Sequence, residues 1–285
     1  MGTKEAIFHK YQACGNDYLV IPSGSDWFKP EKKAIETICS REFGAGSDGI
    51  LLQTEANEGL DLRIFNPDGS EAEKSGNGLR IFSSYLFDSG LWDGSEKRLK
   101  TMGGEVEISR PSPGQISVNM GSASFEPEDI PLNDNSPWIE KEVQIGGRDL
   151  KLTCLSVGNP HCVILFDELP NEMEIAQLGP QIEYYPLFSK RINVQFVKVI
   201  SYEQVEIRIW ERGAGHTLSS GSSSCAVVYA LNYLGKVNEN CEVKMKGGEL
   251  QISIKKGQIF MSGPVSKSYS GVFSEDFLQS IAQKY

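Results

Sequence analysis

The chain contains an internal repeat, and this feature constrains its fold more than any other. Residues 103–121 read GGEVEISRPSPGQISVNMG, and residues 247–263, about 144 positions later, read GGELQISIKKGQIFMSG. Shorter segments recur in the same order at nearly the same offset: Arg63–Asn66 with Arg208–Glu211, Ser75–Gly78 with Ser220–Ser223, Gly90 with Gly235, and Gly15–Tyr18 with Gly158–His161. Repetition at a fixed offset indicates duplicated structural units. We therefore predict two copies of one domain of roughly 145 residues.

Each copy shows the same order of predicted elements. Two strands flank a Gly-Asn turn, an alternating strand follows, and a Gly/Ser-rich turn opens a helix that ends at a C′ glycine, Gly90 or Gly235. A hairpin closes each copy. The predicted ranges are 6–9, 18–21, 61–65, 78–87, 105–109 and 115–119, with an extra helix at 30–41, and then 152–156, 163–166, 205–210, 224–234, 249–255 and 258–261.

The helix of the second copy, CAVVYALNYL, is apolar nearly all round, which predicts burial on every side. We therefore expect an α+β fold of two pseudo-symmetric domains, each a mixed or antiparallel sheet wrapped around a central helix. The expected domains span residues 1–123 and 124–264, with 124–137 as the link between copies. The tail, residues 265–285, is expected to pack back on the first domain.

Composition excludes several classes of protein. With 39% hydrophobic and 23% charged residues the chain can form a core, and a net charge of −10 argues against a nucleic-acid surface. The sequence shows neither an apolar run of 18 residues nor a signal peptide, so we expect no membrane partner. The cysteines form no C-x-x-C pair, which favours a reduced, cytoplasmic protein without zinc or disulfides: Cys14, Cys39, Cys154, Cys162, Cys225 and Cys241.

Ser75 and Ser220 stand at the N-cap positions of the two predicted buried helices. The first backbone N–H groups of a helix lack intrahelical partners, and the helix dipole places partial positive charge there. Two such ends facing each other across the domain boundary would bind a small anionic group such as a carboxylate. Either serine alone is also explained as an ordinary N-cap. Their equivalent positions in a duplicated chain favour a paired site.

Two motifs, FNPDGSEAEKSGNGLRIF and ERGAGHTLSSGSSSCA, resemble the signature motifs of diaminopimelate epimerase, a family of cofactor-independent amino-acid epimerases. The resemblance continues through KYQACGNDYLVI, FGAGSDGILL, VGNPHCVI, LGPQIE, RINVQFV and KGGELQIS, nearly the whole chain. It implies two pseudo-symmetric halves, in agreement with the repeat. It also implies an isomerase that interconverts LL- and meso-2,6-diaminopimelate by two-base α-proton transfer, for lysine and peptidoglycan precursors, without pyridoxal phosphate.

In this family the positions held here by Ser75 and Ser220 are cysteines. One thiolate removes the α-proton from one face of the substrate, and the other thiol returns a proton to the opposite face. A cysteine, with a pKa of about 8.5, can act as base and acid near neutral pH, whereas an alkyl hydroxyl is a far poorer base. The resemblance therefore predicts little or no epimerase activity for this chain as it stands.

Three explanations of the serines stay open. Both cysteines could have been replaced by engineering, to trap substrate or to prevent oxidative cross-linking of two facing thiols. A natural paralogue could use serines for a dehydration or for racemisation of another amino acid. The chain could also be a non-catalytic protein that binds a diamino diacid. His216, which stands where the family has glutamate in E-R-G-A-G-E-T, indicates that the parent was an unusual homologue.

The resemblance assigns further residues to the site. It places His161 and Glu211 with Ser75 and Ser220 as catalytic residues. It also implies that the substrate is bound by side chains at the distal head and by backbone amides at the reacting carboxylate: Asn16, Asn66, Asn159, Asn193, Glu211 and Arg212, and then Gly76, Asn77, Gly221 and Ser222. Without the resemblance the asparagines of the first set would be interpreted as turn residues. No cofactor or metal is implied. The expected partner is a small amino-acid substrate, with the protein a monomer or homodimer.

Overall fold

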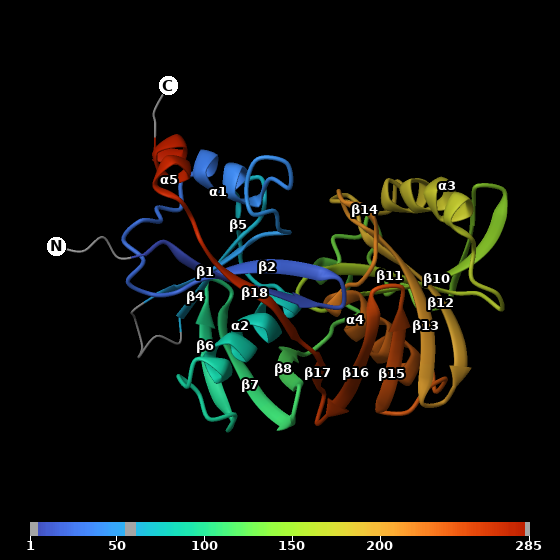
Figure 1. Cartoon of the computed structure of the whole chain (residues 1–285). Coiled ribbons are helices and arrows are strands. Elements are labelled where there is room, and N and C mark those ends of the chain that lie inside the picture. Colours follow the sequence, from blue (N-terminus) through green and yellow to red (C-terminus); the bar gives the residue numbers. More distant parts are fainter. Residues whose placement is uncertain (1–4, 55–60, 283–285) are drawn as a thin grey trace. The chain divides into compact units, whose positions relative to one another are not determined.

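The structure, a computed structural model, describes residues 5–54 and 61–282. The chain divides into two compact units. The first is formed by the chain up to Val118 together with the stretch from Gly263 onward, and the second by Asn119–Ser262. In each unit strands surround one long helix, α2 (Gly76–Asp88) or α4 (Gly221–Tyr233), as Figure 1 shows. The predicted α+β class is confirmed.

The first unit is a mixed sheet whose strands pair in the order β18–β1–β2–β3–β4–β6–β7–β8, with β5 added beside β4. The pairs β2–β3 and β4–β6 are parallel, and the others are antiparallel. The strands are β1 (Ile7–Ala13), β2 (Asn16–Ile21), β3 (Ile50–Thr54), β4 (Asp61–Phe65), β5 (Glu71–Ala72), β6 (Lys97–Thr101), β7 (Gly104–Ser112), β8 (Gln115–Gly121) and β18 (Ser266–Val272). Two shorter helices accompany them, α1 (Lys32–Cys39) and α5 (Glu275–Ala282).

The second unit repeats this pattern. Its strands pair in the order β9–β10–β11–β12–β13–β15–β16–β17, with β14 beside β13, and the parallel pairs are β11–β12 and β13–β15. Its elements are β9 (Lys141–Ile145), β10 (Arg148–Ser156), β11 (Pro160–Leu165), α3 (Glu172–Glu183), β12 (Asn193–Ser201), β13 (Gln204–Glu211), β14 (Gly215–Thr217), β15 (Asn240–Met245), β16 (Gly248–Lys255) and β17 (Gln258–Pro264). The parallel pairs therefore fall at equivalent places in both units, as a duplicated chain requires.

The central helices are buried along most of their length. In α4 the run Cys225–Val228 is fully buried, and only the end near Tyr233 is exposed. Both helices end as predicted, because Gly90 and Gly235 follow them with φ of +70° and +68°, the left-handed conformation that stops a helix. The sheets therefore present the N-terminal ends of α2 and α4 at fixed places in their own units.

Several predicted ranges differ from the observed ones. The first helix is Lys32–Cys39 instead of 30–41, and the first strand continues from Ile7 to Ala13 because the tight turn lies at Cys14 and Gly15, both with positive φ. Helix α3 was not predicted. The stretch 124–137, predicted as the link between copies, packs on the second unit, where Ile130 is buried in the core and Ser124 bridges to Ser156.

Candidate active site

Ser75 begins helix α2 as its N-cap in the first unit. Its Oγ accepts a hydrogen bond from Gly78 N at 3.1 Å, and the Tyr18 hydroxyl lies 3.3 Å from the same oxygen. Gly78 leaves space for this arrangement, since a Cβ there would lie 3.2 Å from Ser75 Oγ. The ring of Tyr18 is held against Gly49, where a Cβ would approach Tyr18 Cε1 to 2.6 Å. The first unit thus places a phenol next to one of the two predicted base positions.

Two of the predicted substrate-binding residues of the first unit meet, and a third lies apart. Asn77 Nδ2 donates to Asn16 Oδ1 at 3.2 Å, which joins the start of β2 to the first turn of α2. Asn66 instead belongs to a turn, where its Nδ2 donates to Ser70 Oγ at 3.0 Å. For Asn66 the contacts in the structure are those of a turn residue.

Ser220 begins helix α4 in the same way in the second unit. Its Oγ accepts from Ser223 N at 3.4 Å and lies 3.5 Å from Ser222 Oγ. Burial raises the pKa of Glu211 above its ordinary value, and a hydrogen bond with Ser220 partly offsets this. The second unit thus places a carboxyl group of raised pKa next to the other predicted base position.

His161 is completely buried, with both ring nitrogens hydrogen-bonded. Its Nδ1 lies 3.0 Å from Gln195 Nε2, which donates, so the proton resides on Nε2, 2.9 Å from Asn159 Oδ1. Burial lowers the pKa of His161 to about 3, and the positive charge of Arg212 lowers it further. The imidazole is therefore neutral, and it holds the Asn159 amide.

Arg212 lies at the turn between β13 and β14, and this turn is braced by neighbouring residues. Asn193 Oδ1 accepts from Arg212 N at 3.0 Å, while Asn193 Nδ2 donates to Pro160 O at 2.8 Å. Glu183, from the end of α3, accepts from Gly213 N at 2.9 Å and from Trp210 Nε1 at 2.8 Å. The turn thus presents the exposed Arg212 side chain from a fixed backbone.

Glu183→Gln should lower the free energy of unfolding by about 1–3 kcal/mol, because either orientation of the new amide turns its NH₂ toward a donor, Gly213 N or Trp210 Nε1. Glu168→Gln is the matched control. Glu168 pairs with Lys198 at 2.8 Å, but its side chain is 84% exposed, so we expect a loss below about 0.5 kcal/mol. Urea denaturation measures the free energy of unfolding of both variants. Equal losses would show that the hydrogen bonds of Glu183 to Gly213 and Trp210 contribute nothing to stability.

Several residues that shape the site were missed in the sequence, although they lie in the motifs quoted for the resemblance. They hold other site residues by contacts from distant segments, and they are Tyr18, Asp48, Arg80, Glu183 and Gln195. The sequence did contain one signal for such residues, namely a polar residue inside a helix or strand that is expected to be buried. Arg80, in the buried helix α2, and Gln195, in the middle of β12, are both fully buried.

None of the described helices is long and apolar enough to cross a membrane. Within the described part of the chain, His, Cys, Asp and Glu side chains form no group of three that could hold a metal ion.

Sequence comparison gives one family. A model of the diaminopimelate epimerase family matches residues 8–126 and 153–268. A protein named diaminopimelate epimerase 2 from Nostoc sp. (strain PCC 7120) is 46% identical over 274 residues, with 94% of this chain and 96% of the relative covered. Diaminopimelate epimerase from Moorella thermoacetica is 34% identical over 278 residues, with coverage of 94% and 99%.

Solved structures share the fold. A phenazine biosynthesis protein of the PhzF family from Bacillus anthracis matches with a TM-score of 0.67 at 15% identity, over 95% of this chain and 100% of that one. A hydroxyproline epimerase from Agrobacterium vitis, with bound trans-4-OH-L-proline, matches with a TM-score of 0.67 at 11% identity, over 95% and 91% of the two chains. At such low identity the likeness extends to the fold alone.

Proposed function

The chain belongs to the diaminopimelate epimerase family, and from this premise we propose that it binds 2,6-diaminopimelate at a site built for two-base α-proton transfer between the LL and meso isomers. The observation that carries the proposal is the pair of serine N-caps. Ser75 and Ser220 begin the two buried helices of a duplicated fold, and each accepts a backbone hydrogen bond in the first turn. Inverting a carbon centre requires one proton-transferring group for each face, and a duplicated cap supplies two.

The helix ends also supply the electrostatic part of the proposal. Deprotonation at the α-carbon moves negative charge onto the adjacent carboxylate. Backbone N–H groups at Gly76, Asn77, Gly221 and Ser222 lie in the first turns of α2 and α4, where the helix dipole favours negative charge. No cofactor is needed for this stabilisation, although the acceleration also requires competent bases.

Each serine has its own polar neighbour, and the two neighbours differ. Ser220 adjoins Glu211, whose raised pKa suits it to accept a proton, and Ser75 adjoins the Tyr18 hydroxyl. His161 contributes as a neutral imidazole that holds Asn159. A hydroxyl remains a much weaker base than a thiolate, so we propose that the serines leave epimerisation slow or absent while substrate binding survives.

Arg212 carries the proposed recognition of the distal head. Its guanidinium would bind the distal carboxylate, and a bidentate pair of this kind is both strong and geometrically selective. The resemblance assigns amide donors and acceptors for the substrate to Asn16, Asn66, Asn159 and Asn193. This set favours a substrate with two amino-acid heads over a substrate with one. We propose that the protein acts in the cytoplasm, as a monomer or homodimer.

Calorimetry on the unmodified chain tests substrate choice. We expect LL- or meso-diaminopimelate to bind, and Arg212→Gln to weaken binding by about 30-fold or more, because a charge-assisted pair contributes about 2 kcal/mol or more. Lys244→Gln is the control, since Lys244 pairs with Glu249 on a strand surface and should leave affinity unchanged.

The alternative functions predict other results of this titration. Binding and turnover of a single-headed amino acid such as proline, with none of diaminopimelate, would favour a racemase or dehydratase acting on another substrate. Tight diaminopimelate binding without chemistry, even after both cysteines are introduced, would favour a non-catalytic binding protein.

A further inference from the structure

A line of hydrogen bonds in the first unit runs through two asparagines of the proposed site. Arg80 Nη2 donates to Asn77 Oδ1 at 2.6 Å, Asn77 Nδ2 donates to Asn16 Oδ1 at 3.2 Å, and Asn16 Nδ2 donates to Asp48 Oδ2 at 2.9 Å. We propose that Asp48 and Arg80 are positioning residues that fix the amide orientation of Asn16 and Asn77. The inference rests on the proposed function, which assigns both asparagines to the substrate.

The two ends of this line determine its direction. A guanidinium can only donate, so Asn77 must turn its carbonyl oxygen toward Arg80. A carboxylate can only accept, so Asn16 must turn its NH₂ toward Asp48. The central Asn77–Asn16 bond satisfies both conditions in one arrangement, and flipping either amide would set donor against donor or acceptor against acceptor. The polarity of both asparagines is therefore set by their neighbours.

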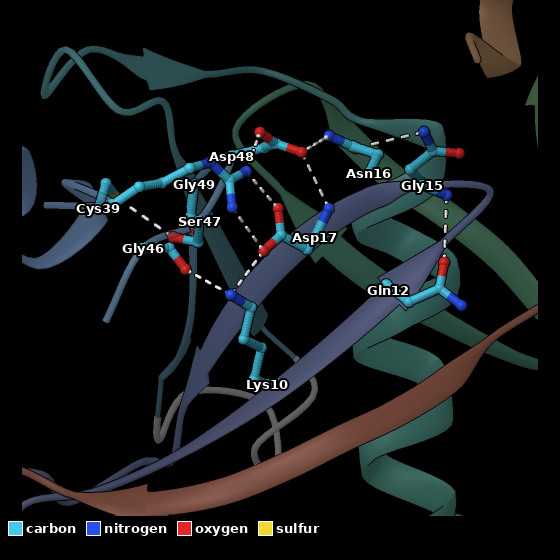
Figure 2. Close-up of polar contacts among 12 residues, drawn as sticks. Lys10, Gln12, Gly15, Asn16, Asp17, Cys39, Gly46, Ser47, Asp48 and Gly49 are labelled. Carbon is cyan, nitrogen blue, oxygen red and sulfur yellow. Dashed lines mark hydrogen bonds and ion pairs between the residues drawn. The ribbon is translucent and has the colours of Figure 1, made fainter. Parts of the chain in front are cut away.

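Each end is itself held in place. Asp48 Oδ2 also accepts from Asp17 N at 3.0 Å, and Asp48 Oδ1 accepts from Arg41 Nη2 at 2.8 Å. Asp17 accepts from Arg41 at 2.7 Å. Asp17 also pairs with Lys10 at 2.7 Å, as Figure 2 shows. At the other end Arg80 is fully buried in α2.

The ion pairs around Asp48 hold side chains in place, although they contribute little to the free energy of unfolding. Arg41 is 55% exposed, and pairs of this kind contribute little to stability because solvent screens them. Burial alone would raise the pKa of Asp17, but hydrogen bonds from Arg41 and Lys10 outweigh it and lower the pKa to about 2, so Asp17 stays charged. A charged Asp17 keeps Lys10 and Arg41 in place, and Arg41 in turn donates to Asp48 Oδ1.

The fixed orientation has a chemical consequence for the ligand. After these contacts, each asparagine keeps one amide hydrogen and one carbonyl lone pair. A substrate carboxylate needs the hydrogen and a substrate ammonium needs the lone pair, so a flipped amide would offer the wrong group to each. Asp48 and Arg80 would thus favour one orientation of a bound amino-acid head without touching it.

Calorimetry with meso-diaminopimelate tests the proposal on the full chain. Asp48→Ala removes the acceptor that orients Asn16 and so permits this amide to flip, and we expect affinity to fall about tenfold, the equivalent of one lost hydrogen bond. Arg98→Gln is the matched control, because it removes an exposed ion pair with Glu105 in the same unit and leaves the line untouched, and we expect a change below about twofold. Arg80→Lys keeps a donor beside Asn77 and should bind better than Arg80→Gln, which can present an acceptor.

Side-chain amide resonances of ¹⁵N-labelled protein provide a second readout that needs no ligand. Asp48→Ala should shift the amide resonances of both Asn16 and Asn77, whereas Arg98→Gln should shift neither strongly. If the unmodified chain binds no diaminopimelate but the resonances respond in this way, the proposed function fails and the positioning role stands. Unchanged resonances and unchanged affinity in Asp48→Ala would overturn the positioning role, and this variant still tests the role if the Arg80 variants do not fold.

Discussion

The variant Ser75→Cys/Ser220→Cys is expected to interconvert LL- and meso-diaminopimelate at least about 10³-fold faster than the unmodified chain, because two proton-transferring groups are restored together. A helix N-terminus lowers the pKa of a thiol, and Ser75 and Ser220 both occupy N-cap positions. Each new thiol would therefore be partly ionised near neutral pH, which neither serine hydroxyl is. Initial rates from chiral chromatography of the two isomers measure the gain.

The single variants and a control sharpen this prediction. Ser75→Cys and Ser220→Cys alone each restore one group only, so we expect both to remain far slower than the double variant. Ser219→Cys places a thiol beside the second cap but outside the helix, and it should give no gain. Comparable rates for the unmodified chain and the double variant would contradict the assignment of Ser75 and Ser220 to proton transfer.

Acid should destabilise the protein through His161. Its pKa is about 3 in the folded chain and about 6.5 when unfolded, so between these values the unfolded chain binds more protons. Stability therefore rises with pH in this window and is lost as pH falls from 6.5 toward 3, by about 1.4 kcal/mol per pH unit. Urea denaturation at several pH values measures this slope.

The variant His161→Gln should remove most of that slope, because a glutamine does not titrate. His216→Gln is the control: His216 is exposed, and although burial and the charge of Lys246 lower its pKa, the shift is smaller. We expect the His216→Gln variant to keep most of the pH dependence of stability that the unmodified chain shows. If His161→Gln and the unmodified chain lose stability equally between pH 6.5 and pH 4, His161 does not become protonated on unfolding.

The repeat was sufficient to predict the class of fold, because an element predicted in one copy is predicted again at the equivalent place in the other. Helix α3 escaped prediction because Gly179 and Pro180, residues typical of helix ends, lie inside it. Its packing explains the glycine, since a Cβ at Gly179 would lie 2.4 Å from the Trp210 ring. The second unit thus keeps a helix that local propensity alone does not indicate.

The site was predictable where it depends on local structure. Ser75 and Ser220 follow from N-cap chemistry next to a buried helix, and both are observed as N-caps. Contacts between distant segments could not be predicted, because they depend on how the sheet brings strands together. Tyr18 beside Ser75, Asp48 beside Asn16 and Glu183 beside the Arg212 turn are of this kind. The individual substrate-binding roles came from the family resemblance and stay predictions.

The isotopic course of the reaction tests the central claim most directly. The Ser75→Cys/Ser220→Cys variant is incubated with LL-diaminopimelate in deuterium oxide, and both isomers are examined by NMR and chiral chromatography. Two-base transfer predicts early meso product with deuterium at the inverted α-carbon, while the remaining LL substrate is unlabelled. Deuterium entering LL-diaminopimelate without inversion, or equal labelling by the unmodified serine chain, would contradict the claim.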